Sequence, residues 1–279
     1  MAADVVIITK DRYPQLTRAV QQAKNLKDIN NVVVVDSSEH PNTQLLNTLG
    51  TSYYLTPNVK SGYARQTGLL HTSTTLVAFI DDDIIITEND WLTNMAASIG
   101  NCGAVSSRIL FHDPKYPEVK KLSNYGRENS ASSGAMMLNK TKVLSVGGWN
   151  GCVHYGEDYE LSVRLKKAGL HWRTTNKVKC IHPCTRKQYI DRAYHHGYGL
   201  LDVIPSSIHN RIYLLMRSLA SALVMPYYYG LRSRDTSIFK LYLLYRWLYL
   251  IGYFKGLMKI KRRFGLLTTV KKMIHLDDT

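Results

Sequence analysis

The stretch Leu76-Val-Ala-Phe-Ile-Asp-Asp-Asp83 joins an apolar run to three consecutive carboxylates. The unbroken apolar run over residues 76–80 is typical of a strand that is buried on both faces of a sheet. Two β-branched runs precede it, over residues 4–9 and 31–36, and segments with helical spacing separate the runs. Strands that alternate with helices predict an α/β fold with a mainly parallel sheet flanked by helices.

Turn and capping residues indicate further elements of this pattern. Pro14 suits the first turn of a helix over residues 13–26, and Gly169 suits the C-cap of a helix over 158–167. Residues 112–133 are polar, which predicts a long loop, and long loops in compact domains are often functional. We also expect helices over 43–49 and 61–71, and strands over 52–55, 135–138 and 178–181.

The three carboxylates stand where a parallel sheet places its ligands, beyond the carboxyl end of a strand. Adjacent carboxylates repel one another, and binding of a divalent cation is the simplest way to offset this repulsion. Asp81 and Asp83 point the same way if the strand continues, and Mg²⁺ or Mn²⁺ prefers such oxygen ligands together with substrate phosphates. Asp-x-Asp is a short and common pattern, so a solvated acidic turn or a helix N-cap stays open as the alternative.

A second acidic pair, Glu157 and Asp158, follows Gly156 at the start of a predicted helix. A carboxylate held at such an edge can act as a general base. Acidic residues in a first helical turn also stabilise the helix dipole without any catalytic role. Both interpretations fit the residues alone.

His182 follows the predicted strand over residues 178–181 and could give a metal one nitrogen ligand. A single histidine is more often a structural residue. Cys180 and Cys184 flank it, but their spacing matches no structural zinc pattern. The chain has four cysteines, which are too few and too unevenly placed for a disulfide framework, so we expect a reducing compartment.

The C-terminal part has a different composition, because residues 208–231 and 237–264 are apolar and aromatic with isolated Arg and Lys. Neither contains 18 uninterrupted apolar residues, whereas a transmembrane helix needs a run of about 20. Aromatic rings followed by a basic cluster suit helices that lie at an anionic membrane interface. Packing on the core or in a homodimer is the alternative. With no secretory signal evident, we expect a cytoplasmic protein, peripheral at the cytoplasmic face of a membrane.

The formal net charge of +15 predicts an anionic partner, which could be nucleic acid, an anionic membrane or a phosphorylated substrate. No nucleic-acid reading motif accompanies the charge, so we expect no nucleic-acid partner. A sugar nucleotidyltransferase should carry a glycine-rich phosphate loop after its first strand, but Thr9-Lys-Asp-Arg12 contains no glycine. The remaining anionic partners are a phosphorylated substrate and a membrane.

The order of eight short segments resembles the family 2 glycosyltransferases with a GT-A fold, over roughly residues 4–200. Each segment is weak alone, and their shared order makes the resemblance specific. The segments are Ile7-Ile-Thr-Lys-Asp-Arg12, Val33-Val-Val-Asp-Ser-Ser38, Gly62-Tyr-Ala-Arg-Gln-Thr-Gly68, Phe79-Ile-Asp-Asp-Asp83, Ser133-Gly-Ala-Met136, Gly147-Gly-Trp-Asn150, Gly156-Glu-Asp158 and His182-Pro183.

The resemblance implies a GT-A (Rossmann-like) catalytic domain over residues 1–204, followed by a helical, basic and aromatic extension over 205–279. It implies inverting transfer of a sugar from a nucleotide diphosphate-sugar, with UDP-sugar favoured, to an acceptor hydroxyl, with Mn²⁺ or Mg²⁺. The acceptor is lipid-linked or a soluble glycan or glycoprotein. A non-catalytic relative that binds sugar nucleotides is the third possibility.

Site roles also follow from the resemblance, position by position. Asp158 is expected to be the catalytic base, and Glu157 to orient acceptor or metal-site groups. Asp83 is expected to ligate the metal, with His182 as a candidate additional ligand. The sequence departs from the family pattern at Lys10-Asp11 and Gln66-Thr67, which affects details of the donor pocket. The residues expected to bind the donor are Thr9, Asp11, Arg12, Asp36, Arg65, Asp81 and Asp82.

Overall fold

The computed structural model describes residues 2–117, 132–153, 156–203 and 208–274. The chain forms two compact units, Met1–Thr185 and Arg186–Thr279. The expected division into a catalytic domain and an extension at residue 204/205 stays a prediction. Much of the loop predicted over 112–133 falls outside the described residues.

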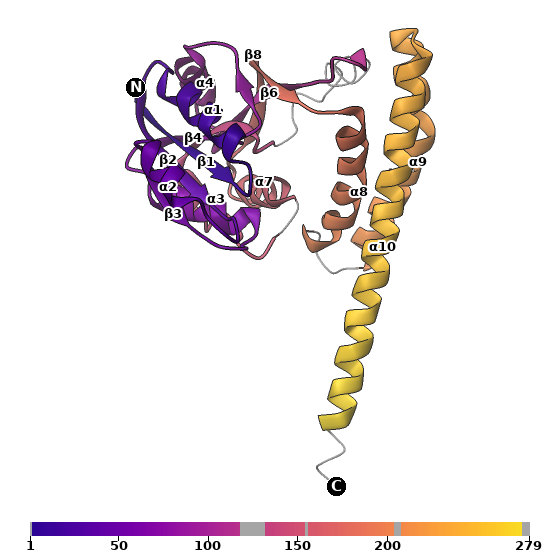
Figure 1. The fold of residues 1–279 in the computed structure, drawn as a ribbon. Helices are drawn as coiled ribbons and strands as arrows, with labels where there is room; N and C mark the ends of the chain where they lie inside the picture. Colours follow the sequence, from indigo (N-terminus) through magenta and orange to yellow (C-terminus); the bar gives the residue numbers. More distant parts are fainter. Residues whose placement is uncertain (1, 118–131, 154–155, 204–207, 275–279) are drawn as a thin grey trace. The chain divides into compact units, whose positions relative to one another are not determined.

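An eight-stranded sheet organises the described part of the first unit, in the order β3-β2-β1-β4-β7-β6-β8-β5 (Figure 1). Strands β1 to β4 pair in parallel, whereas β7 is antiparallel to both of its neighbours. Strand β8 pairs in parallel with β6 and antiparallel with the short β5. The strands are Ala3–Thr9 (β1), Ile29–Asp36 (β2), Ser52–Leu55 (β3), Leu76–Ile80 (β4), Ile85–Ile86 (β5), Ala104–His112 (β6), Ala135–Asn139 (β7) and Trp172–Pro183 (β8).

Helices cover both faces of this sheet, as the apolar runs predicted. Successive side chains of β4 enter opposite faces, so Ala78 belongs to one buried cluster and Phe79 to the other. Helices α1 and α4 pack on the first face, and α3 and α7 on the second (Figure 1). The α/β prediction is confirmed. The helices are Tyr13–Lys24 (α1), Thr43–Thr48 (α2), Ser61–Leu70 (α3), Trp91–Ile99 (α4), Lys140–Ser145 (α6) and Glu157–Lys167 (α7).

Strand β6 was not predicted from the sequence, although it is a long strand within the sheet. Two serines, Ser106 and Ser107, interrupt the apolar pattern of β6. Both are buried, and burial is tolerated because both have hydrogen-bond partners. Ser106 donates to the carbonyl of Ser132 and accepts from Trp172 Nε1, and Ser107 donates to the carbonyl of Ala135. These partners come from distant parts of the chain, so local periodicity could not reveal the strand.

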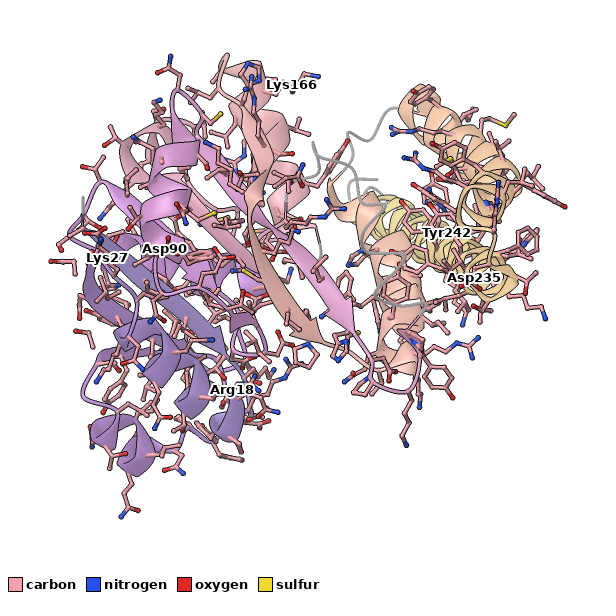
Figure 2. All side chains as sticks on the ribbon, turned by 90° about the horizontal axis from the view of Figure 1, so that it is seen from above. Arg18, Lys27, Asp90, Lys166, Asp235 and Tyr242 are labelled. Atoms are coloured by element: carbon pink, nitrogen blue, oxygen red, sulfur yellow. The ribbon has the colours of Figure 1, made fainter. Side chains whose placement is uncertain are left out.

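The second unit contains three helices in its described residues: Arg186–Val203 (α8), Ile208–Ser233 (α9) and Thr236–Ile274 (α10). Helices α8 and α10 approach so closely that a Cβ on Gly252 would lie 2.1 Å from the carbonyl oxygen of Tyr194. Tyr242, labelled in Figure 2, stacks on Tyr245 and meets Tyr229 edge-on. The prediction of a helical, aromatic-rich C-terminal region is confirmed. Within the described ranges, no helix has both the length and the apolar character needed to cross a membrane.

Candidate functional site

Polar side chains gather at the carboxyl edge of the parallel strands. Thr9 ends β1 and Asp36 ends β2, and the two residues are in register. The acidic triplet directly follows β4, which is the other neighbour of β1. Thr9 Oγ1 donates to Asp82 Oδ2 at 2.7 Å and so ties the ends of β1 and β4 together. This edge is where open α/β sheets bind their ligands.

Asp82 is the most buried residue of the acidic triplet. Burial raises the pKa of its carboxyl group to about 6, and the neighbouring charge of Asp83 acts in the same direction. The hydrogen bond from Thr9 and the charge of Arg12 oppose this shift. Burial of an isolated carboxylate costs much free energy. The contacts with Thr9 and Arg12 offset part of this cost and so stabilise Asp82 beside Asp81 and Asp83.

Asp83 has a cation on one side and an imidazole on the other. Arg12 Nη1 donates to Asp83 Oδ2 at 2.8 Å and lies 3.4 Å from Asp82 Oδ1. His182 Nε2 lies 3.4 Å from Asp83 Oδ1, across the turn from the end of β8. The sequence placed Asp83 and His182 about a hundred residues apart, and the fold brings them together.

The pair Asp83 and His182 fits a divalent cation. His182 Nδ1 lies 2.9 Å from the carbonyl oxygen of Pro183, which can only accept, so Nδ1 carries the proton of the neutral ring. In the neutral ring the lone pair of Nε2 would face Asp83 Oδ1, and a cation between these two atoms would relieve the repulsion. Among the described residues no group of three or more His, Cys, Asp and Glu side chains could hold an ion, so phosphates and water would complete the shell.

Arg65 on α3 lies beneath the acidic residues and is only 3% exposed. Its Nη2 donates to Asp81 Oδ1 at 2.8 Å, its Nε donates to Glu157 Oε1 at 3.3 Å, and its Nη1 donates to the carbonyl of Ser133 at 3.4 Å. The aromatic rings that it meets are those of Phe79 and Trp149, with its guanidinium carbon 5.9 Å and 5.6 Å from their centroids. One buried cation therefore joins four separate segments of the site.

Glu157 and Asp158 begin α7 directly after Gly156, whose φ of 80° lies in the left-handed region. Burial raises the pKa of the Asp158 carboxyl to about 6, and the charge of Glu157 adds to the effect. The charge of Arg65 and a hydrogen bond from the Tyr159 amide, 2.7 Å from Asp158 Oδ1, oppose it. A carboxylate with such a pKa is ionised at neutral pH and still basic enough to accept a proton.

Asp36 and Asp11 belong to a separate network. The Asp36 carboxylate is fully buried, accepts from the amide of Ser38 at 2.9 Å and from its hydroxyl, and accepts from the Tyr13 hydroxyl at 2.9 Å. The amide of Asp11, a residue with a positive φ of 56°, donates to Ser38 Oγ at 2.8 Å. Asp36 thus holds the loop after β1. Ser38 closes one of the eight family-like segments and Tyr13 begins a predicted helix, but the sequence assigned neither of them a role in the site.

The comparisons with known proteins show the family and the fold of the chain. The model of "Glycosyl transferase family 2" matches residues 4–156, and that of "Glycosyl transferase family group 2" matches residues 119–259. No match is found among curated proteins.

Solved structures share the fold at low identity. A mannosyltransferase from Pyrobaculum calidifontis, solved with GDP-Man and Mn²⁺, is 17% identical with a TM-score of 0.65, over 91% of this chain and 86% of that one. A mycobacterial protein is 17% identical with a TM-score of 0.54, over 74% and 76%. TarS of S. aureus is 15% identical with a TM-score of 0.52, over 80% of this chain and 46% of its own. Since the first family model covers more than half of the residues, this chain is a glycosyltransferase that belongs to family 2.

Proposed function

We propose that this glycosyltransferase moves a sugar from a nucleoside diphosphate sugar to an acceptor hydroxyl by a single inverting displacement. The observation that carries the proposal is the buried Arg65, which joins Asp81 at the end of β4 to Glu157 at the start of α7. A donor-binding acidic edge and a candidate base are thereby held in one rigid site. Preorganised groups of this kind supply much of an enzyme's rate enhancement.

Donor binding is assigned to the edge formed by β1, β2 and β4. Thr9 and Asp82 hold each other, Arg12 is half-exposed beside them, and Asp81 keeps one oxygen on Arg65. Arginine suits diphosphate recognition because its planar donors match phosphate oxygens. Asp36 and Asp11 support the nucleoside side by shaping the loop after β1. The residues proposed for this donor pocket are Thr9, Asp11, Arg12, Asp36, Arg65, Asp81 and Asp82.

Asp83 and His182 are the proposed holders of Mn²⁺ or Mg²⁺. When bound, the cation supplies Lewis-acid stabilisation of the departing nucleoside diphosphate. The chain's own contribution is to aim Asp83 Oδ1 and His182 Nε2 at one position, with the imidazole oriented by the carbonyl of Pro183. The relative solved with GDP-Man and Mn²⁺ supports this assignment, without deciding between the two metals.

Asp158 is the proposed general base. It takes the proton from the acceptor hydroxyl as that oxygen attacks the sugar, and Glu157, fixed by Arg65, keeps the first turn of α7 in place. Proton transfer from a positioned base contributes about 10²–10⁴-fold to a rate. The alternative role, in which both carboxylates only stabilise the dipole of α7, explains neither the burial of Glu157 nor its bond to Arg65.

The acceptor is proposed to be lipid-linked, reached at the cytoplasmic face of an anionic membrane. Residues 208–274 contain 13 Lys or Arg and one acidic residue, Asp235. Helices α9 and α10 also expose large apolar side chains, such as Leu231 at 79% and Trp247 at 47%. Cationic, aromatic helices suit such a surface. A soluble glycan acceptor, with these faces buried in a homodimer, is the second candidate.

Nucleotide release tests the proposal directly. The protein is incubated with UDP-, GDP- and dTDP-sugars, with Mn²⁺, Mg²⁺ or EDTA, and with lipid-phosphate or glycan acceptors. The family resemblance favours UDP-sugars, and the mannosyltransferase solved with GDP-Man makes GDP-sugars the second choice. We expect metal-dependent release from one donor, lost in Asp83→Ala. If neither donors nor metals raise the melting temperature, and none is turned over, the proposed function is wrong.

A further inference from the structure

Arg12 stands where the proposed metal site is most negative. Its Nη1 donates to Asp83 Oδ2 at 2.8 Å and lies 3.4 Å from Asp82 Oδ1. The side chain is 52% exposed, whereas Asp83 is 21% exposed. The guanidinium is therefore more exposed than the two carboxylates, and its single positive charge offsets part of their negative charge when no other cation is present.

We propose that Arg12 is an internal counter-ion that competes with the divalent cation for Asp83 and leaves when a diphosphate arrives. This inference rests on the proposed function, because it takes Asp83 and His182 as the metal holders. It adds an order of events: the cation binds weakly to the protein alone and firmly together with the nucleotide. Arg12 then exchanges a carboxylate partner for a phosphate partner.

The contacts of Asp83 explain the competition. One carboxylate oxygen holds Arg12, and the other lies 3.4 Å from His182 Nε2. A cation placed between Asp83 and His182 would therefore have a guanidinium charge on the far oxygen of the same carboxylate. Two cations on one carboxylate repel each other. The nucleotide removes the conflict, because its diphosphate brings negative charge and accepts paired hydrogen bonds from Arg12.

The exchange requires movement of the side chain alone. The backbone before Arg12 is fixed, because the amide of Asp11 donates to Ser38 Oγ at 2.8 Å and Asp36 holds Ser38. The guanidinium is half in solvent, and exposed ion pairs of arginine with carboxylates are weak, so they change partner readily. If Arg12 only stiffened the acidic turn, its removal would weaken metal binding instead.

Binding of Mn²⁺ alone, followed by the electron paramagnetic resonance signal of the free ion, separates these two roles. In Arg12→Gln without nucleotide we expect Mn²⁺ to bind about two- to fivefold more tightly than in the native protein, as loss of an exposed ion pair predicts. Lys10→Gln is the matched control. Lys10 is exposed two residues away and contacts Asn58 rather than a carboxylate, so its removal should change Mn²⁺ affinity much less.

Two further variants define the site and the role of charge. Asp83→Asn should lose the Mn²⁺ affinity in both the native and the Arg12→Gln background. Arg12→Lys keeps the positive charge and should bind Mn²⁺ about as weakly as the native protein. Equal or weaker Mn²⁺ binding by Arg12→Gln would overturn the inference, as would an equal gain in Lys10→Gln.

Measuring Mn²⁺ binding in the presence of a nucleotide distinguishes this inference from the proposed function. With UDP or GDP present, the native protein should gain Mn²⁺ affinity, and Arg12→Gln should gain less, because its diphosphate contact is missing. Mn²⁺ binding that depends on nucleotide but is unaffected by Arg12 would overturn only the counter-ion role. Absence of Mn²⁺ binding in every variant, with or without nucleotide, would overturn the metal assignment and this inference together.

Discussion

The guanidinium of Arg65 donates to Asp81 Oδ1 at 2.8 Å from a position that is almost completely buried. The same group donates to Glu157, 92 residues further along the chain. A buried arginine with two carboxylate partners fixes their separation more firmly than a lysine could, because its donors form a rigid planar fork. Arg65 thus ties the proposed donor edge to the start of α7.

Arg65→Lys should therefore lower kcat about 10- to 100-fold, since a lysine keeps the charge but cannot hold Asp81 and Glu157 together. Steady-state kinetics check this. The KM for the donor should change less than kcat, because the donor contacts at Thr9 and Arg12 remain. An unchanged kcat in a stably folded variant would remove Arg65 from the positioning role.

Asp158→Asn should reduce kcat by about 10²–10⁴-fold while nucleotide binding persists. Glu160→Gln is the control, because it removes a carboxylate from the same first turn of α7 and leaves the Arg65 contacts intact. It should retain most of the activity. Comparable losses in both variants would indicate that the carboxylates act only through the helix dipole.

Activity should fall on the acid side of about pH 6, because Asp158 must be ionised to accept a proton and its pKa is raised to about 6. The pH profile of kcat/KM should lose about tenfold per pH unit below this value. Asp82 has a similarly raised pKa, so the profile is also measured in Asp82→Asn, where the acid limb should persist. In Asp158→Asn the residual activity should lack it.

Stability should have the opposite pH dependence. The pKa of Asp158 in the folded chain is raised above its unfolded value of 3.8, so between pH 4 and 6 the folded state binds more protons. The contribution of Asp158 to the free energy of unfolding is therefore fully present below the unfolded pKa of 3.8. It is lost as the pH rises through about 6. Asp158→Asn should consequently be more stable than the native protein at pH 7, on the order of 1 kcal/mol. Urea unfolding at pH 5 and pH 7 measures the difference.

The C-terminal helices should bind anionic vesicles and release them at high salt, if the acceptor is presented at a membrane. Sedimentation with vesicles of anionic or zwitterionic lipid measures this. Trp247→Ser should weaken binding, whereas Tyr63→Ser, which removes an exposed aromatic ring from α3, should not. A salt-resistant dimer without vesicle binding would favour the soluble-acceptor alternative.

Local sequence was sufficient for most elements of the first unit. Two β-branched runs and one apolar run gave β1, β2 and β4 within one or two residues, because strands buried on both faces are mostly apolar along their length. Helices α1, α3 and α7 followed from spacing and from residues such as Pro14 and Gly169. The ordered motifs gave the family, which the family model confirms.

Only the tertiary structure decided which of the candidate site residues lie in contact with one another. Asp83 meets His182 because β5, which begins two residues after Asp83, pairs with the end of β8 in the register Ile85 to Ile181. Arg65 was expected near the diphosphate, and its buried contacts with Asp81 and Glu157 depend on how α3 packs under that edge. Sequence periodicity reports which face of an element is buried. It carries no information about which distant element covers that face. The pairs Arg65–Glu157 and Asp83–His182 are of that second kind.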